Sequence, residues 1–154
     1  MKRIQMLVAS LLITGSCLAA LAATPVAASA ATIEVRETSR GKILVDEAGF
    51  TLYVFTADKK HQDHCITIEE NGVKCSTAWP PLEVTEAPTV GPGLKHPNRI
   101  STTTLPGGAK QVTFKKKPLY TYIGDFMPGQ VNYIGALAFG GFWYGISARG
   151  MMVR

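Results

Sequence analysis

The segment from Asp58 to Cys65 holds the densest group of side chains that could do chemistry. Two histidines, an aspartate and a cysteine lie close together in it, and a second cysteine follows ten residues later: His61, Asp63, His64, Cys65 and Cys75. Zinc and copper accept imidazole and thiolate ligands, so the segment is a candidate metal site with His61 and His64 as weak candidate ligands. The spacing, however, matches none of the compact zinc patterns.

The two cysteines favour a different chemistry if the protein leaves the cytoplasm. Oxidising compartments convert paired thiols into disulfides, and an oxidised cysteine cannot bind a metal as a thiolate. We therefore expect a Cys65–Cys75 disulfide that pins a solvated loop. In the chain-entropy model such a crosslink stabilises the fold by about 2–3 kcal/mol. No cofactor is predicted.

Sequence templates for catalysis are absent. The chain contains no G-x-S-x-G, no H-E-x-x-H and no phosphate-binding glycine loop. No nucleophile lies beside a general base in the aromatic motifs described next. The sequence therefore does not indicate an enzyme.

A short aromatic pattern occurs twice. Both copies read L-Y-x-aromatic-x-x-D, at 52–58 and 119–125, and they are 67 residues apart, while Trp79 and Trp143 are 64 residues apart. These similar offsets indicate two tandem units of about fifty residues that pack on each other with pseudo-twofold symmetry. The candidate binding residues are Tyr53, Phe55, Asp58, Tyr120, Tyr122, Asp125, Trp79 and Trp143.

The side chains of this pattern have two interpretations. Residues i and i+2 of a strand share a face, so Tyr53 and Phe55 point one way and Leu52 and Val54 the other. An aspartate just past a strand most often accepts backbone N–H bonds and fixes a turn, which is the role that we favour for Asp58 and its counterpart. The alternative is a tyrosine–aspartate site that binds a ligand. Tryptophans in small β domains likewise belong to the core more often than to a ligand platform.

Short β-prone runs bounded by turn residues recur after residue 40, and no long segment has helical periodicity. Prolines and glycines are dense between 83 and 108, which predicts an irregular connection with a short strand near Arg99–Thr103. The predicted strands are Lys42–Val45, Thr51–Thr56, Gln111–Phe114, Leu119–Ile123 and Phe142–Ser147.

These runs predict an all-β fold, a small antiparallel sheet domain built from two tandem, pseudo-symmetric repeats. The domain spans 41–154, with repeat one at about 41–84, a connection at about 85–108 and repeat two at about 109–150. Residues 31–40 are interpreted as a polar lead-in to this domain.

The N-terminus has the layout of a secretory signal peptide. Two basic residues precede an uncharged apolar stretch at 4–23, and the A-S-A sequence ending at Ala30 fits the signal-peptidase rule. We expect cleavage after Ala30, with a weaker site after Ala22, and a mature chain that works outside the cytoplasm. Two alternatives stay open, because the apolar stretch is long enough for a retained membrane helix and Cys17 could carry a lipid anchor.

The charge of the chain limits its partners. The formal net charge is +5, and residues 1–30 hold two basic and no acidic residues, so the mature part carries +3. This modest excess does not indicate nucleic acid binding, but it permits weak attraction to an anionic cell surface. The run Lys115–Lys117 is interpreted as a solvated turn that could meet such a surface.

The doubled pattern resembles the hallmark of a bacterial family, the "secreted repeat of unknown function" proteins, which include predicted lipoproteins and periplasmic proteins. Their Y-x-[FWY]-x-x-D motif stands here at 53–58 and 120–125, and the cysteine pair followed by W-P-P-L is also similar. The resemblance covers Gly41–Gly150 and implies export without a defined activity. The cysteine loop is longer and more charged here, and the sequence before Cys17 is a poor lipoprotein signal, which favours a free exported protein.

The sequence thus supports one main hypothesis and one alternative. The main hypothesis is an exported, non-enzymatic repeat protein of the cell envelope that acts in binding or assembly, with an envelope protein or a small ligand as its partner. The alternative is an extracytoplasmic redox or metal-handling protein that uses the loop of Cys65, Cys75, His61 and His64.

Overall fold

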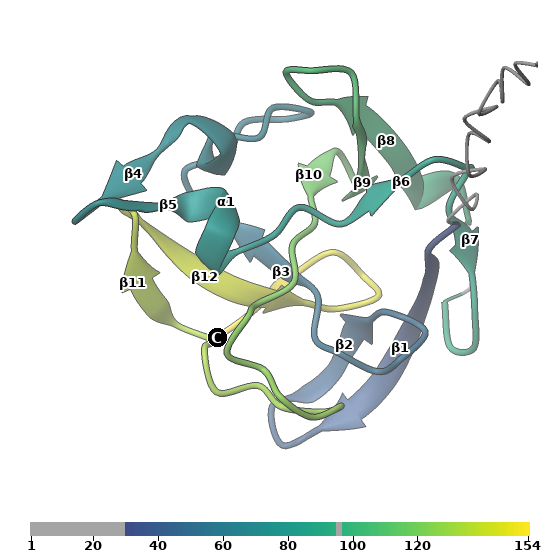
Figure 1. Cartoon of the computed structure of the whole chain (residues 1–154). Coiled ribbons are helices and arrows are strands. Elements are labelled where there is room, and N and C mark those ends of the chain that lie inside the picture. Colours follow the sequence, from purple (N-terminus) through teal and green to yellow (C-terminus); the bar gives the residue numbers. More distant parts are fainter. Residues whose placement is uncertain (1–29, 95–96) are drawn as a thin grey trace, which may run out of the picture.

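The computed structural model describes residues 30–94 and 97–154, and these residues form short strands with almost no helix (Figure 1). The all-β fold class with small antiparallel sheets is therefore confirmed. The leader predicted at 1–30, Cys17 included, lies almost entirely outside the described residues. Within the described ranges, no helix has the length and apolar character that crossing a bilayer requires.

Each repeat begins with a β-hairpin. Strand β1 (Thr32–Thr38) pairs antiparallel with β2 (Gly41–Val45), and β8 (Ile100–Thr104) pairs antiparallel with β9 (Lys110–Phe114). The other elements are β3 (Tyr53–Phe55), β4 (Glu69–Glu70), β5 (Val73–Lys74), β6 (Glu83–Val84), β7 (Thr89–Val90), β10 (Lys117–Pro118), β11 (Ala136–Ala138), β12 (Gly141–Ile146), β13 (Met152–Val153), the helix α1 (Cys75–Ala78) and the 3₁₀ turns η1 (Cys65–Thr67) and η2 (Pro97–Arg99).

The two repeats exchange their C-terminal segments. Strand β3 of repeat one pairs antiparallel with β12 of repeat two, and Phe55 lies opposite Trp143. In the reverse direction, Pro81 of repeat one bridges to Tyr120 of repeat two, and β6 pairs with β9. Each aromatic motif is therefore hydrogen-bonded to the end of the other repeat, and each repeat completes the sheet of its neighbour.

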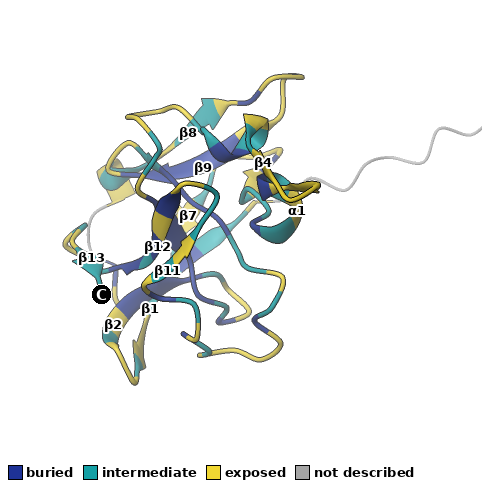
Figure 2. Cartoon of the chain, turned by 90° about the vertical axis from the view of Figure 1, so that its left-hand side faces the viewer, coloured by how far each residue is buried: buried dark blue, intermediate teal, exposed yellow. Residues whose placement is uncertain are grey.

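The strand residues alternate between two apolar clusters. Tyr53 and Phe55 enter a cluster with both tryptophans, whereas Leu52 and Val54 enter a second cluster with residues of the two hairpins. This confirms the predicted division of the first motif between two faces. Figure 2 shows the buried residues concentrated along β2, β9 and β12, where the two clusters meet the sheets.

Two segments differ from the expectation. Residues 31–40 are not a lead-in, because Thr32–Thr38 form β1, and Ile33 is fully buried in the second cluster. The alternation of apolar and polar residues in this strand was not recognised in the sequence, because most of its residues are polar. The predicted strand Leu119–Ile123 is extended but forms no regular ladder: Thr121 N–H donates to the Pro80 carbonyl at 3.0 Å. Leu82 N–H returns a bond to the Leu119 carbonyl at 2.9 Å, but Pro80 has no N–H to donate, so the ladder is interrupted there.

The exchange predicts that neither repeat folds alone. Residues 31–92 and residues 97–154, produced separately, would each expose half of a shared core, so we expect broad, uncooperative thermal unfolding of each fragment. The intact mature chain should unfold cooperatively and show the near-ultraviolet circular dichroism of packed tryptophans. A cooperative transition in either fragment by itself would contradict the exchanged architecture.

Candidate functional site

The tyrosine and aspartate of each motif are joined across the two repeats. The Tyr53 hydroxyl donates to Asp125 Oδ2 at 2.8 Å, and the Tyr120 hydroxyl donates to Asp58 Oδ2 at 2.9 Å. The two tyrosines also face each other through their backbones, with N–H to O distances of 2.9 and 3.0 Å. The local pseudo-twofold axis therefore passes between Tyr53 and Tyr120.

The aromatic residues of the motifs stack around the same axis. The rings of Trp79 and Trp143 are parallel, with centroids 3.9 Å apart and an interplanar angle of 2°. Each indole also meets the edge of the tyrosine of its own repeat, with centroids 5.1 Å apart in both cases. Phe55 stacks on Trp143 at 4.3 Å, and Tyr122 lies on Trp79 at 4.1 Å. The structure thus brings all eight predicted binding residues into one cluster, where six are buried and Asp58 and Tyr122 stay partly exposed.

The first aspartate also organises the loop that leads to the disulfide. Asp58 Oδ1 accepts the His64 N–H at 2.8 Å, and Asp63 Oδ1 accepts the Ile66 N–H at 2.8 Å. Burial raises the pKa of Asp58 to about 7, and the nearby Asp63 carboxylate adds to the increase. Burial likewise raises the pKa of the Tyr120 phenol, helped by the charges of both aspartates. One phenol is therefore held between two carboxyl groups.

The second aspartate has a different environment. Asp125 is buried, its Oδ2 accepts only the Tyr53 hydroxyl, and its Oδ1 has no hydrogen-bond partner among the described residues. Burial raises the pKa of the Asp125 carboxyl. It also raises the pKa of the Tyr53 phenol, as does the neighbouring carboxylate. Tyr122 lies beside Tyr133, with ring centroids 3.8 Å apart, and its pKa is raised to about 12 by burial and by this neighbour.

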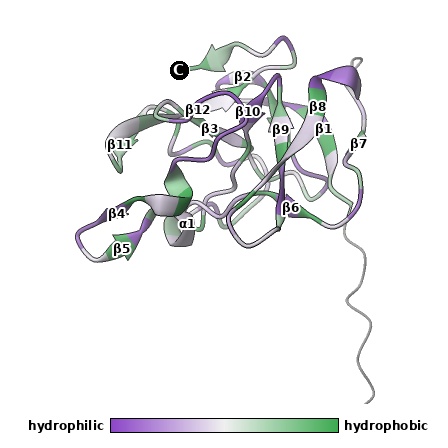
Figure 3. Ribbon diagram, turned by 90° about the horizontal axis from the view of Figure 1, so that it is seen from above, coloured by the Kyte–Doolittle hydropathy of each residue, from purple (hydrophilic) through white to green (hydrophobic). Residues whose placement is uncertain are grey.

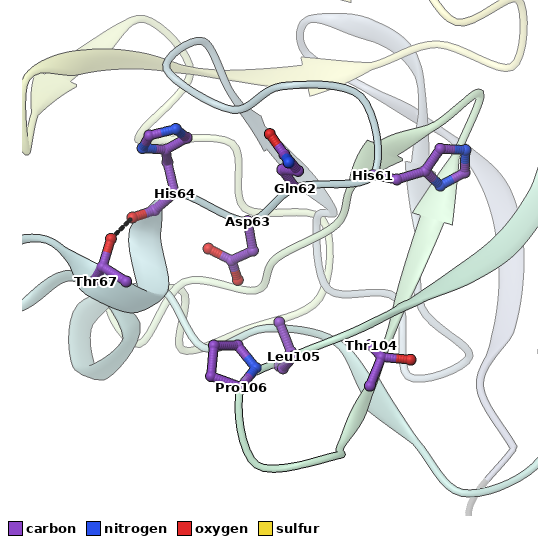
Figure 4. Close-up of a pocket in the computed structure, with 8 residues that line it drawn as sticks. All are labelled: His61, Gln62, Asp63, His64, Thr67, Thr104, Leu105 and Pro106. Carbon is purple, nitrogen blue, oxygen red and sulfur yellow. Dashed lines mark hydrogen bonds between the residues drawn. The ribbon is translucent and has the colours of Figure 1, made fainter.

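The predicted Cys65–Cys75 disulfide is present, and both cysteines are fully buried in the tryptophan cluster. The loop before it borders a hollow of about 350 Å³, lined by His61, Gln62, Asp63, His64, Thr67, Thr104, Leu105 and Pro106. Figure 4 shows the two imidazole rings directed away from the Asp63 carboxylate. Among the described residues, no three histidine, cysteine or acidic side chains are grouped to hold a metal ion. With both thiols oxidised, the redox or metal-handling alternative is not favoured.

Two surface features were not identified from the sequence. Leu137 and Phe142 form an exposed cross-strand pair on β11 and β12. A second hollow, of about 340 Å³, is lined by His61, Asn98, Arg99, Ser101, Lys115 and Lys116. The sequence showed only the lysine run; the register of β9 and β10 places Lys115 and Lys116 in a two-residue hairpin loop, where asparagine and glycine are usual.

The tyrosine–aspartate bonds give a first prediction for this site. Tyr53→Phe and Tyr120→Phe should each lower the free energy of unfolding by about 1.5–3 kcal/mol, since each removes a hydrogen bond to a charged group. The loss should be greater for Tyr53→Phe, because it leaves Asp125 without its partner, whereas Asp58 keeps the His64 N–H. Tyr144→Phe, the same change on a partly exposed residue, is the control and should alter stability by less than about 0.5 kcal/mol. Equal, negligible losses in urea denaturation would contradict the cross-repeat bonds.

The raised pKa of Asp58 gives a second prediction. Folding raises this pKa from 3.8 to about 7, so the folded protein holds a proton that the unfolded chain releases over that interval. The stabilisation that this proton provides is present in full below pH 3.8 and is lost as the pH rises through about 7. We expect the melting temperature to fall across this range, and Asp58→Asn to flatten the decline. The exposed Glu86→Gln serves as the control; an unchanged slope in Asp58→Asn would show that Asp58 does not take up the proton.

Comparison with known proteins agrees with this geometry. The model of a family described as "secreted repeat of unknown function" matches residues 34–83 and 101–146. The matched ranges contain both motifs and both tryptophans, and they begin at the hairpins rather than at residues 41 and 109. No curated protein and no solved structure matches the chain. The family description supports a location outside the cytoplasm, and the chain belongs to the family of secreted repeats of unknown function.

Proposed function

We propose that the protein is a non-enzymatic binding module of the cell envelope that contacts a partner protein through the face formed by β11 and β12. The supporting observation is the apolar pair on this face. Leu137 and Phe142 lie directly opposite each other and are 68% and 43% exposed. Tyr144 continues the face, with its ring stacked 5.9 Å from that of Phe142.

The edge of the sheet favours the same surface. Strand β11 pairs only with β12 among the described strands, so its other side is free to pair. In Figures 1 and 3, β11 lies at the outer side of the molecule. An exposed strand edge beside aromatic and aliphatic side chains suits the addition of a partner strand, in which backbone bonds give affinity and side-chain contacts give specificity.

The tyrosines and aspartates of the two motifs and the two cysteines have internal roles, which supports binding over catalysis at the motif. The motif tyrosines and aspartates are bonded to each other, and the cysteines are joined. Their hydrogen bonds and stacking hold the two repeats together, so the outward-facing residues of the strands are left for a partner. Function on this view resides in the exposed face, and the family motif provides the scaffold.

A paired substitution tests this proposal. Leu137→Ser together with Phe142→Ser should weaken association with the envelope partner by about tenfold or more, because two exposed apolar anchors are lost. The matched control is Phe126→Ser with Met127→Ser, since these residues are also apolar and highly exposed, at 80% and 62%, but lie on a loop. The measurement is photo-crosslinking of the full chain in native envelope, with partner yield quantified for each variant. Loss of crosslinks in the loop variant, with retention in the strand variant, would reject this face.

A further inference from the structure

We call the second hollow, lined by His61, Asn98, Arg99, Ser101, Lys115 and Lys116, the basic hollow. It lies apart from the proposed protein-binding face on β11 and β12. Its residues come from three separate segments: the loop after β3, η2 with the start of β8, and the β9–β10 turn. Figures 1 and 3 place β8 and β9 on the side of the molecule away from β11. The hollow therefore needs an explanation of its own.

Backbone hydrogen bonds hold the three segments together. Lys115 N–H donates to the Arg99 carbonyl at 2.7 Å, and His61 N–H donates to the Lys116 carbonyl at 2.8 Å. Thr103 adds a bond from its hydroxyl to the His61 carbonyl at 2.6 Å. The arrangement is therefore formed before any ligand arrives, which lowers the entropy cost of binding.

The backbone is in a conformation that is unfavourable for side-chain-bearing residues at three positions of the hollow. His61, Lys115 and Lys116 have φ values of 58°, 49° and 69°, and they are three of the five non-glycine residues with positive φ in the described ranges. Lys115 and Lys116 form the two-residue loop between Phe114 and Lys117, a turn for which asparagine and glycine are strongly preferred. Retaining two lysines in such a turn is conformationally unfavourable, and strain of this kind is typical of ligand-binding positions.

Within the described residues, the cations of the hollow form no ion pair with an acidic side chain. The ion pairs in the described part of the chain are Arg36–Glu34 and Lys42–Glu37, both on the β1–β2 hairpin. In the hollow, Arg99 Nη1 donates to the Ala148 carbonyl at 3.0 Å, and Lys115 Nζ donates to the Arg149 carbonyl. These carbonyls orient the two cations but leave their positive charge available to an anion.

We propose that this hollow binds phosphate groups of an anionic cell-surface polymer. Arginine and lysine suit phosphate oxygens, and Asn98 and Ser101 add neutral donors at the same place. The lining contains no large apolar side chain that could enter a bilayer. A polymer that presents repeated phosphates can contact Arg99 and the exposed Lys115 and Lys116 together, which gives binding that weakens with salt. This site is additional to the proposed protein contact on β11 and β12.

Substitutions in the β9–β10 turn can test the effect of charge on binding without destabilising the fold. Lys115→Asn with Lys116→Gly removes two charges and installs the residues that the turn prefers, so the protein should stay folded with a melting temperature near that of the wild type. The matched control is Arg40→Asn with Lys74→Asn, which removes the same charge from two exposed positions that do not line the hollow.

Long-chain inorganic polyphosphate is the probe, titrated into the full mature chain by calorimetry at two salt concentrations. The turn variant should lose about tenfold or more in affinity, because charge-assisted hydrogen bonds are removed, while the control should lose far less. Equal losses in both variants would overturn the proposal in favour of general charge attraction. Equally tight binding of phosphatidylglycerol vesicles, or of polyglutamate, would overturn it in favour of a lipid surface or of any polyanion.

Discussion

The parallel contact between Trp79 and Trp143 is the interaction on which the rest of the fold depends. Each repeat supplies one indole, and the two rings bury a face against each other, so the two repeats meet at this point. The remaining aromatic contacts follow from it. Phe55 and Tyr122 cover the outer faces of the pair, and the motif tyrosines close its edges. The residues of the family motif therefore form the interface between the two repeats of one chain.

The acidic residue of the motif follows from the same geometry. A tyrosine that closes the edge of a buried indole carries its hydroxyl into the neighbouring repeat, where it needs an acceptor. Asp58 and Asp125 provide that acceptor, and both are partly or fully removed from water as a result. Raised carboxyl pKa values are the electrostatic cost of this arrangement. In repeat one the same carboxylate also fixes the loop that leads into the disulfide.

Local patterns predicted local features well. Alternation placed Tyr53 and Phe55 on one face, turn residues bounded most of the strands, and the cysteine pair indicated the disulfide. The exchange between repeats could not be predicted, because it depends on which distant segment each motif pairs with, and period-two patterns carry no information about partners. The basic hollow was missed for a related reason. Its residues are brought together only by long-range backbone bonds, and a lysine pair in a turn looks like an ordinary solvated loop.

The reciprocal exchange also affects how the chain acquires its structure during export. A chain that emerges from a pore N-terminus first presents Trp79 long before Trp143, which follows 64 residues later. Until then Trp79 has no indole to stack on, and the shared core of the two repeats is incomplete. The stacked tryptophan core can therefore close only after the second tryptophan emerges. More than half of the residue contacts in the fold are non-local, so completion of the core waits for the late part of the chain.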